Sequence, residues 1–475
     1  MYHTARKTSL SWIVTSCIIC GFILQFLTAV NLVCASSHTT GQMNHQLEQE
    51  GCFVILIGKD RTTDGSVLVA HNEDGRDKST RLAYVPRQHH SEKEVHFNYV
   101  TIPQVPETLA YWVMGNSEAV ASKYDNEWVL NGMNEAGVCV TCAVTSTREA
   151  APPEKQGLTR FAIRRLILER ATSARDAVDL FSHLISEYGL ALSPGIPHQT
   201  IACGLADSEE AWLIESSFRH WVAKRVPDDS YSASGNIYTI DTDWDLSSPD
   251  LVEYATDQGW YDPEQGPFSF KDAYTSREAL HSAHSTSRVW QAQVMLNESK
   301  ERKSKVDVSF LWSIISQPPV QTDSTQAFMI WHLRDELPKE LGTLMWHGLG
   351  NATTSVMVPI YMGSTEVPAP YMDSPEDYDT YSAYWQFRLI GTTLYPQRWI
   401  YAAPYKEVRR KLDRLQRGIK RRNMWVEWFA PMYYKFYGVE ALKKVLTTHT
   451  YDELQTALDT ADKIVETLQF EPSDR

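Results

Sequence analysis

The chain has 475 residues, of which 43% are hydrophobic and 22% are charged, and its formal net charge is −14. This composition is typical of globular proteins and does not favour disorder. Proteins that bind nucleic acid generally carry a basic face, so the acidic balance argues against nucleic acid as a partner.

The first 35 residues have the pattern of a secretory signal. Arg6 and Lys7 precede an uncharged apolar run, and the small residues Val33 and Ala35 follow it, at positions suited to signal peptidase. The sequence therefore predicts a cleaved signal peptide and a secreted or endo-lysosomal protein. Because the apolar run is about as long as a membrane-spanning helix, an uncleaved signal anchor is the alternative.

Two Asn-X-Ser/Thr sequons, at Asn297 and Asn351, fit a chain that passes through the secretory pathway. The surrounding sequence does not decide whether either asparagine is accessible. We therefore expect both to be candidate glycosylation sites.

The cysteines are too few for a disulfide scaffold. Beyond residue 51 the chain contains Cys52, Cys139, Cys142 and Cys203. Cys139 and Cys142 form a C-x-x-C within a strand-like run, where residues i and i+3 point to opposite faces. We therefore expect them to pack in the core and not to share a metal ion or a disulfide.

The first pair of predicted strands forms a hairpin. The apolar run 52–58 and the run 66–74 are typical of buried strands, and the turn between them contains Asp64-Gly65. An antiparallel hairpin about this turn would bring Cys52 beside the end of the second strand.

Further strands are predicted before and after a pair of helices. The strands are expected at 95–102, 109–115, 127–132, 137–146, 199–207, 210–216 and 220–226. The helices are expected at 157–172 and 173–189, and Ser173 and Gly189 suit the start and the end of the second one. This order indicates packed layers with a mainly antiparallel sheet.

The C-terminal part, after about residue 370, becomes helical and rich in Trp and Tyr. Within it, residues 409–422 are locally basic. A solvated helix face is the favoured interpretation of this run, and binding to a membrane or a polyanion is the alternative.

Cys52 is the residue whose setting suggests chemistry, because the usual motifs of serine hydrolases, zincins and nucleotide-binding proteins are absent from the sequence. A cysteine nucleophile needs a base. If the chain were cut after Gly51, the α-amine of Cys52 could serve, since its pKa of roughly 7.7–8.0 lies near neutrality. The thiol could make that cut itself, because Gly51 has no side chain to obstruct attack on its carbonyl.

The stretch from Cys52 to Asp74 resembles the start of the mature dipeptidases of peptidase family C69. These are N-terminal nucleophile hydrolases, distantly similar to penicillin V acylases and bile salt hydrolases. The resemblance covers most of 52–415 and continues in NGMNEAGV, LERATSARDAVDLFSHLISEYG, EAWLIESSFRHWVAKRVPDDSYSASGN, LGTLMWHGLGNATTSVMVPIY and YSAYWQFRLIG.

The resemblance implies a role for four residues. Cys52 matches the residue that is both nucleophile and, through its amine, general base. Asp74 matches the acidic residue that holds this amine, and Asn236 falls at the position of an oxyanion-hole asparagine. Arg288 matches an arginine that favours the thiolate. The structural alternatives are core packing for Cys52, turn residues for Asp74 and Asn236, and an ion-pair partner for Arg288.

Two further assignments follow from the same resemblance. The backbone of Val144 and Thr145 is expected to supply the second oxyanion donor. Relatives often have arginine where this chain has His71, whose charge depends on pH, so thiol activation or substrate acceptance could differ here.

Together these inferences predict an α+β fold of the N-terminal nucleophile type, an αββα sandwich of two antiparallel sheets between helical layers with a helical C-terminal extension. The expected organisation is a signal peptide at 1–35, a propeptide at 36–51, a catalytic domain at 52–370 and a helical region at 371–475.

The predicted activity is that of a cysteine-type dipeptidase that forms a Cys52 thioester. It needs no cofactor and no metal, takes short peptides as substrates, has no obligatory membrane partner once the signal is cleaved, and could form an oligomer. The alternatives are an amidase that acts on N-acyl amines and an unprocessed binding protein without catalysis.

Overall fold

The computed structural model describes seven stretches of the chain. These are residues 51–75, 79–122, 128–153, 155–192, 198–372, 374–396 and 402–468. The predicted signal peptide, and the predicted propeptide except Gly51, therefore lie outside the described residues. Among the described residues, no helix has both the length and the apolar composition that crossing a bilayer requires.

The predicted hairpin is present. β1 (Phe53–Ile57) pairs antiparallel with β2 (Val67–Asp74), and Phe53 lies opposite Asn72 in the register. Every residue of both strands is buried, including the polar end of β2 from His71 to Asp74. The hairpin forms the centre of the first sheet.

This first sheet is antiparallel and has six strands in the order β14-β1-β2-β16-β17-β18. The strands that complete it come from distant parts of the chain. They are β14 (Tyr231–Ser234), β16 (Thr325–Leu333), β17 (Thr343–Leu349) and β18 (Val358–Tyr361).

The second sheet is also antiparallel and has eight strands in the order β15-β13-β12-β11-β10-β9-β8-β3. Except for β3 and β15, these are the strands that the sequence predicts. Their bounds are β3 (Thr80–Val85), β8 (Tyr111–Asn116), β9 (Val129–Asn134), β10 (Cys139–Ser146), β11 (Gln199–Ala206), β12 (Ala211–Ser216), β13 (Trp221–Arg225) and β15 (Leu246–Ser247).

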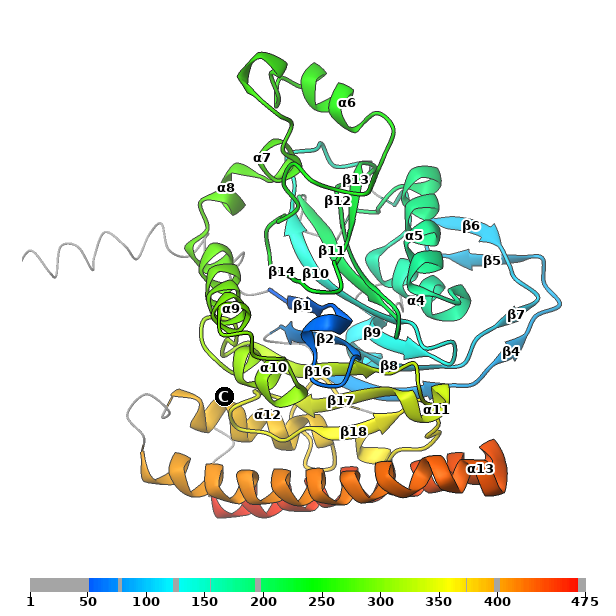
Figure 1. The fold of residues 1–475 in the computed structure, drawn as a ribbon, viewed down its shortest axis with the longest axis vertical. Coiled ribbons are helices and arrows are strands. Elements are labelled where there is room, and N and C mark those ends of the chain that lie inside the picture. The colour runs from blue at the N-terminus through cyan, green and yellow to red at the C-terminus, as the bar shows by residue number, and fades with distance from the viewer. Residues whose placement is uncertain are drawn as a thin grey trace, which may run out of the picture. The chain divides into compact units, whose positions relative to one another are not determined.

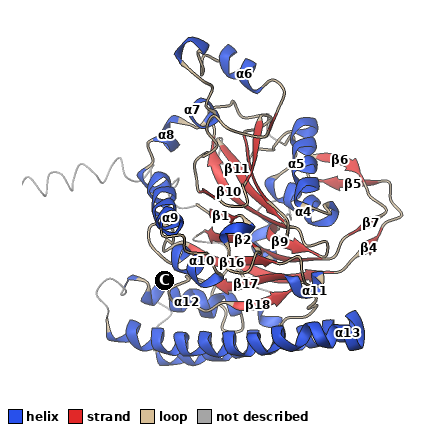
Figure 2. Cartoon of the chain, viewed as in Figure 1, coloured by secondary structure: helices blue, strands red, loops and turns tan. Residues whose placement is uncertain are grey.

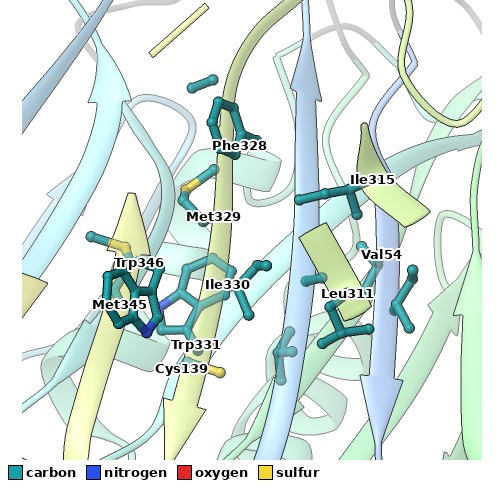
Figure 3. Packing of buried hydrophobic residues seen from close by; sticks show 14 of the residues in the cluster. Val54, Cys139, Leu311, Ile315, Phe328, Met329, Ile330, Trp331, Met345 and Trp346 are labelled. Carbon is teal, nitrogen blue, oxygen red and sulfur yellow. The ribbon is translucent and has the colours of Figure 1, made fainter. Parts of the chain in front are cut away.

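The two sheets pack face to face. Val54 and Leu56 of β1 lie against Gly204 of β11, where a Cβ would come within 3.0 Å of both side chains. Glycine at this position therefore permits the close approach of the two strands. Figure 3 shows side chains of the core around the first sheet, among them Phe328 and Trp331 of β16.

Helices cover the outer face of the second sheet. α4 (Arg160–Arg170) and α5 (Ala174–Tyr188) pack on β9 to β12 and share a hydrophobic cluster with them. α5 begins and ends as predicted, because the Ser173 side chain accepts a hydrogen bond from the Asp176 amide and Gly189 has φ 75°.

Another set of helices covers the first sheet. α9 (Ala283–Glu301) lies beside β14, α10 (Val308–Ile315) contacts β2 and β16, and α12 (Ala383–Leu394) contacts β17. The strands therefore lie between two helical layers, as Figure 2 shows, which confirms the predicted αββα sandwich.

The C-terminal extension is a helical hairpin. α13 (Ala403–Thr467) is interrupted at Gly438, where φ is 79° and ψ is −179°. Arg422 forms an ion pair with Glu453, which requires the two halves to run antiparallel. The hairpin packs against β18 and α12, at the edge of the sandwich seen at the bottom of Figure 1.

Shorter elements fill the connections. Two small antiparallel pairs, β4 with β7 and β5 with β6, stand apart from the main sheets. The remaining bounds are β4 (Gln88–His89), β5 (Glu94–Phe97), β6 (Val100–Pro103), β7 (Glu107–Thr108), α3 (Glu118–Ala121), α6 (Leu251–Asp257), α7 (Phe270–Tyr274), α8 (Arg277–Leu280) and α11 (Lys339–Gly342).

Two expectations about elements need correction. The run 95–102 is not one strand but the hairpin of β5 and β6, since Asn98 and Tyr99 form a turn within it. Cys142 is not merely a core residue, because it forms a disulfide with Cys203, its direct partner across β10 and β11.

The interpretation of the C-x-x-C is otherwise confirmed. Cys139 lies in the cluster between the sheets, whereas Cys142 lies in the cluster under α4 and α5. The two residues thus point to opposite faces of β10, and Cys139 is a free, buried thiol.

Candidate active site

The register of the first hairpin gathers two polar side chains beside Cys52. Since Phe53 pairs with Asn72, Cys52 falls opposite Glu73, and Val54 pairs with His71. Opposed residues of an antiparallel pair share a face, and so do residues two apart on one strand. Cys52, His71 and Glu73 therefore lie together on one face, and their ligand atoms all lie within 4.8 Å of one another.

Glu73 is held in a hydrogen-bond network. Its Oε2 is 3.0 Å from His71 Nε2 and accepts a hydrogen bond of 2.8 Å from Asn131 Nδ2, while Thr141 donates to Asn131 Oδ1 at 2.8 Å. Burial by itself would raise the pKa of Glu73, but the hydrogen bond and charge of His71, with Arg164 and Asn131, lower it to about 2. Glu73 is thus a buried carboxylate at neutral pH.

Asp74 points away from this face and meets Arg288. Arg288, on α9, is fully buried, and its Nη2 donates to Asp74 Oδ2 and to the Val320 carbonyl, each at 2.7 Å. The second oxygen of Asp74 accepts a hydrogen bond of 2.6 Å from Thr325 Oγ1 on β16. Burial raises the pKa of Asp74, and the Arg288 charge and both hydrogen bonds oppose this rise.

The other end of the Arg288 guanidinium reaches the peptide bond before Cys52. Arg288 Nη1 donates to the Gly51 carbonyl at 2.6 Å and to Asn236 Oδ1 at 3.2 Å. Asn236 Nδ2 in turn donates to the Val144 carbonyl at 2.9 Å. The carbonyl that the Cys52 thiol would have to attack is therefore polarised by a fixed cation.

Gly51 fits this position because it has no side chain. A Cβ on Gly51 would collide with Asn236 Oδ1 and lie 2.8 Å from Arg288 Nη1. Any other residue would have to displace one of these two side chains.

The thiol of Cys52 is not ionised by its surroundings in the uncut chain. Burial raises the pKa of the Cys52 thiol well above its usual value, and the charges of Glu73 and Asp74 add to the rise. The Asp74 backbone N–H and the Arg288 charge act in the opposite direction but do not prevail. A nucleophile in this setting needs a proton acceptor close to its sulfur.

The structure thus brings together Cys52, His71, Asp74, Asn236 and Arg288, all of which the sequence analysis singled out. Val144 reaches the site through its carbonyl, which positions Asn236. The Thr145 hydroxyl is 3.0 Å from Thr200 Oγ1.

Sequence reasoning missed Glu73, Asn131 and Thr325. The hairpin register could have revealed Glu73, because a residue two positions from His71 and opposite Cys52 must share their face. No local signal points to Thr325, since it lies on β16, a strand that was not predicted.

The cluster of Cys52, His71 and Glu73 offers a sulfur, a nitrogen and an oxygen ligand, a set of donors that zinc accepts. In the uncut chain the carboxylate of Glu73 is already engaged by His71 and Asn131. The cluster therefore acts as a hydrogen-bond network that fixes the face on which the sulfur lies.

The two sequons differ in accessibility. Asn297 is exposed on α9, and its Oδ1 accepts a hydrogen bond from Tyr231. Asn351 is buried and accepts hydrogen bonds from Gln321 and Thr353. Glycosylation at both sequons stays a prediction, which the exposure of Asn297 favours and the burial of Asn351 disfavours.

Comparison with known proteins places this geometry in a family. Residues 51–318 and 311–411 match the model of peptidase family C69. A probable dipeptidase of Salmonella dublin is 27% identical over 362 residues, which cover 66% of this chain and 81% of the relative. A probable dipeptidase B of Lactococcus lactis is 25% identical over 389 residues, which cover 70% of this chain and 79% of the relative.

Similar solved structures include a penicillin V acylase from Agrobacterium tumefaciens, with a TM-score of 0.39 and 14% identity over 68% of this chain and 88% of the acylase. A conjugated bile acid hydrolase mutant from Clostridium perfringens has a TM-score of 0.39 and 13% identity, over 69% of this chain and 97% of the hydrolase. Similarity this distant adds nothing to the assignment, which rests on the family model. The chain belongs to peptidase family C69 and is a hydrolase that acts on peptides.

Proposed function

We propose that the protein is a cysteine-type dipeptidase whose nucleophile is Cys52, and that it becomes active when the Gly51–Cys52 bond is cut. The observation that carries this proposal is the position of that bond. The Gly51 carbonyl accepts a hydrogen bond from Arg288 and adjoins Asn236, while the next residue supplies the only free cysteine thiol that the described residues place at this site.

The cut would proceed by attack of the Cys52 sulfur on the Gly51 carbonyl carbon. The C–N bond of the peptide breaks, the amine of Cys52 takes a proton, and a thioester joins Gly51 to the sulfur. Water then hydrolyses this thioester, which leaves a carboxylate on Gly51 and a free thiol. Arg288 Nη1 supports this step, because a cation 2.6 Å from the carbonyl oxygen stabilises the negative charge that develops there.

In the processed enzyme the new α-amine would be the base that the thiol lacks. It accepts the thiol proton as the sulfur attacks the peptide carbonyl of the substrate, and it gives that proton to the leaving amine. It then takes a proton from the water that attacks the thioester and gives it to the sulfur as the C–S bond breaks, so the enzyme returns to its starting state. Arg288 is held in place for both reactions by Asp74, Val320 and Asn236.

A secretory or endo-lysosomal location fits this proposal. The disulfide between Cys142 and Cys203 suits an oxidising compartment, and the sequon at Asn297 is exposed. We therefore keep the assignment of residues 1–35 as a signal peptide and 36–51 as a propeptide, with the catalytic and helical parts following.

The proposal is tested by the N-terminus of the protein purified from the cells that secrete it. We expect the chain to begin at Cys52, and we expect Cys52→Ala to retain Gly51 and to lose dipeptide hydrolysis by several orders of magnitude. A wild-type chain that retains residues before Cys52 and still cleaves dipeptides would contradict the proposal.

A panel of dipeptides and N-acyl amides then separates a dipeptidase from an amidase. Both reactions use the same nucleophile, so the ratio of kcat/KM for the two substrate classes is the deciding quantity. We expect this ratio to favour dipeptides.

A further inference from the structure

The first helix of α13, up to Gly438, has two unlike faces. One face is buried against the sandwich through residues that recur every three or four positions, as an amphipathic helix requires. These residues are Val408, Leu412, Gln416, Ile419, Asn423, Val426 and Ala430. The opposite face is open to solvent.

The second half of this open face is aromatic and apolar. Met424, Trp425, Trp428, Met432 and Phe436 are 66%, 62%, 72%, 55% and 71% exposed. Their spacing of three to four residues places them along one side of the helix. Large side chains that are contiguous and this exposed mark an interaction surface rather than ordinary solvent-facing positions.

The first half of the same face is basic. Arg410, Arg414, Arg417 and Arg421 are exposed and continue the spacing of the aromatic residues, and Lys435 lies among those residues. We call this combined strip, from Arg410 to Phe436, the outer strip of α13.

The acidic residues of this stretch do not neutralise the outer strip. Asp413 is paired with Arg409, and Glu427 is paired with Arg334. The outer strip is therefore locally positive on a protein whose formal net charge is −14.

We propose that the outer strip of α13 binds the surface of an anionic lipid membrane, with the helix lying parallel to it. Trp side chains favour the boundary between headgroups and acyl chains, and exposed Met and Phe side chains can enter the outer part of the acyl region. The arginine row would face the anionic headgroups, whose negative charge complements it.

A second copy of this chain is a poorer occupant of the outer strip. A parallel pairing of two strips would bring arginine against arginine, and an antiparallel pairing would lay the arginines on aromatic rings but leave their charge unneutralised, because the strip itself has no acidic residue. A lipid surface supplies the missing negative charge and accepts the aromatic side chains at the same time. This inference does not depend on the proposed function.

This inference revises the interpretation of the basic run 409–422 as a solvated helix face. The structure divides that run. Arg409 and Arg422 form ion pairs with Asp413 and Glu453, whereas Arg414, Arg417 and Arg421 face outward in line with Trp425 and Trp428.

The test is co-sedimentation of the full chain with vesicles of phosphatidylcholine alone and of phosphatidylcholine with phosphatidylserine as the minor component. We expect binding to the vesicles that contain phosphatidylserine, and weaker binding as salt is added. The variant R414Q/R417Q/R421Q should bind these vesicles roughly 100-fold more weakly, given the usual contribution of each charge near an anionic surface. The variant W425S/W428S/F436S should also lose binding.

Matched controls change exposed residues of the same kinds elsewhere. K300Q/R302Q/K303Q changes the net charge by the same amount at exposed positions, and W290S removes a Trp that is 63% exposed on α9. Both should bind as the wild type does. All variants are purified in the same way and share one N-terminus, so a difference between them reports on α13, and equal unfolding temperatures show that each remains folded.

Three results would overturn the proposal. The first is equal binding to the two kinds of vesicle, and the second is an equal loss of binding in the variants and the controls. The third is a dimer in solution that W425S/W428S/F436S converts to a monomer while vesicle binding is absent, which would assign the outer strip to a second copy.

Discussion

At the scale of single residues, the site depends on Gly51, which has no side chain, and on Arg288, whose guanidinium has several partners. Gly51 leaves the space that Asn236 and Arg288 occupy, and Arg288 links the Gly51 carbonyl to Asp74. The planar fork of a guanidinium can hold both partners at once, which the single ammonium of a lysine cannot do. The residues around the Gly51–Cys52 bond therefore act as one unit.

Gly51→Val is expected to block the cut before Cys52. The new side chain would collide with Asn236 and Arg288, so the Gly51 carbonyl could not keep its hydrogen bond to Arg288. Mass spectrometry of the purified variant should show the uncut chain, and dipeptide hydrolysis should fall by at least about tenfold, as expected when a productive geometry is lost.

The control is the Gly51→Val chain cut before Cys52 by an added protease, which should be active because the cut removes Val at this position. If Gly51→Val were processed as fast as the wild type, the assigned pose of this peptide bond would be wrong.

Glu73 should make the free energy of unfolding depend on pH in the acid range. Its pKa is lowered in the folded protein from 4.5 to about 2, so its contribution to stability is complete above pH 4.5 and is lost as the pH falls towards 2. Urea denaturation of the wild type should show this loss over that range, on the order of 3 kcal/mol at most.

Glu73→Gln should flatten the acid dependence of stability and lower stability at pH 7, because His71 loses its charged partner. The exposed Glu253→Gln is the control and should follow the wild-type curve. An unchanged acid dependence in Glu73→Gln would show that Glu73 is not the group that titrates.

At the scale of elements, β1 and β2 position Cys52, the proposed nucleophile, and β10 positions Asn236 beside it. The pairing of β1 with β2 sets the face of Cys52, and β10 carries Val144, whose carbonyl holds Asn236. The disulfide between Cys142 and Cys203 links β10 to β11 two residues before Val144. We infer that it stabilises the strand that supports Asn236.

The double variant C142A/C203A should therefore be less stable by about 2–4 kcal/mol, as is typical when a native disulfide is removed. Urea denaturation checks this, and dithiothreitol should lower the stability of the wild type towards that of the variant. The free and buried Cys139→Ala is the control, because it removes a thiol without removing a cross-link. Equal stability of C142A/C203A and the wild type would contradict this role.

At the scale of the whole molecule, the C-terminal hairpin is continuous with the catalytic part. One hydrophobic cluster extends from β1 to α13. Polar contacts join the same elements, since Gln416 of α13 bonds both the amide and the carbonyl of Met357, and Tyr361 of β18 donates to Asn423. The described residues of α12 and α13 therefore pack as part of the sandwich.

We expect Leu412→Ala, in the buried face of α13, to destabilise the whole molecule by about 2–5 kcal/mol. On heating, the helical circular dichroism signal and dipeptide hydrolysis should be lost at the same temperature, which should be lower than in the wild type. The reason is that the shared core unfolds cooperatively. The exposed Arg414→Ala, on the same helix, is the control. Loss of the α13 signal while hydrolysis persists would show two independent domains.

Local patterns in the sequence were enough to predict the first hairpin, α4 and α5. Turn residues at Asp64-Gly65 and continuous apolar runs determine β1 and β2, and the capping residues Ser173 and Gly189 determine the ends of α5. These features depend on residues close together in the chain, so the neighbourhood of Cys52 and Asp74 could be predicted as well.

Only the tertiary structure decided which distant residues complete the site. Arg288 is 214 residues from Asp74 in sequence, and Thr325 reaches Asp74 from β16. Burial of Asn351 and the disulfide partner of Cys142 are equally non-local. The period of a strand determines which face a side chain occupies, whereas the order of strands in the sheets determines what that face meets.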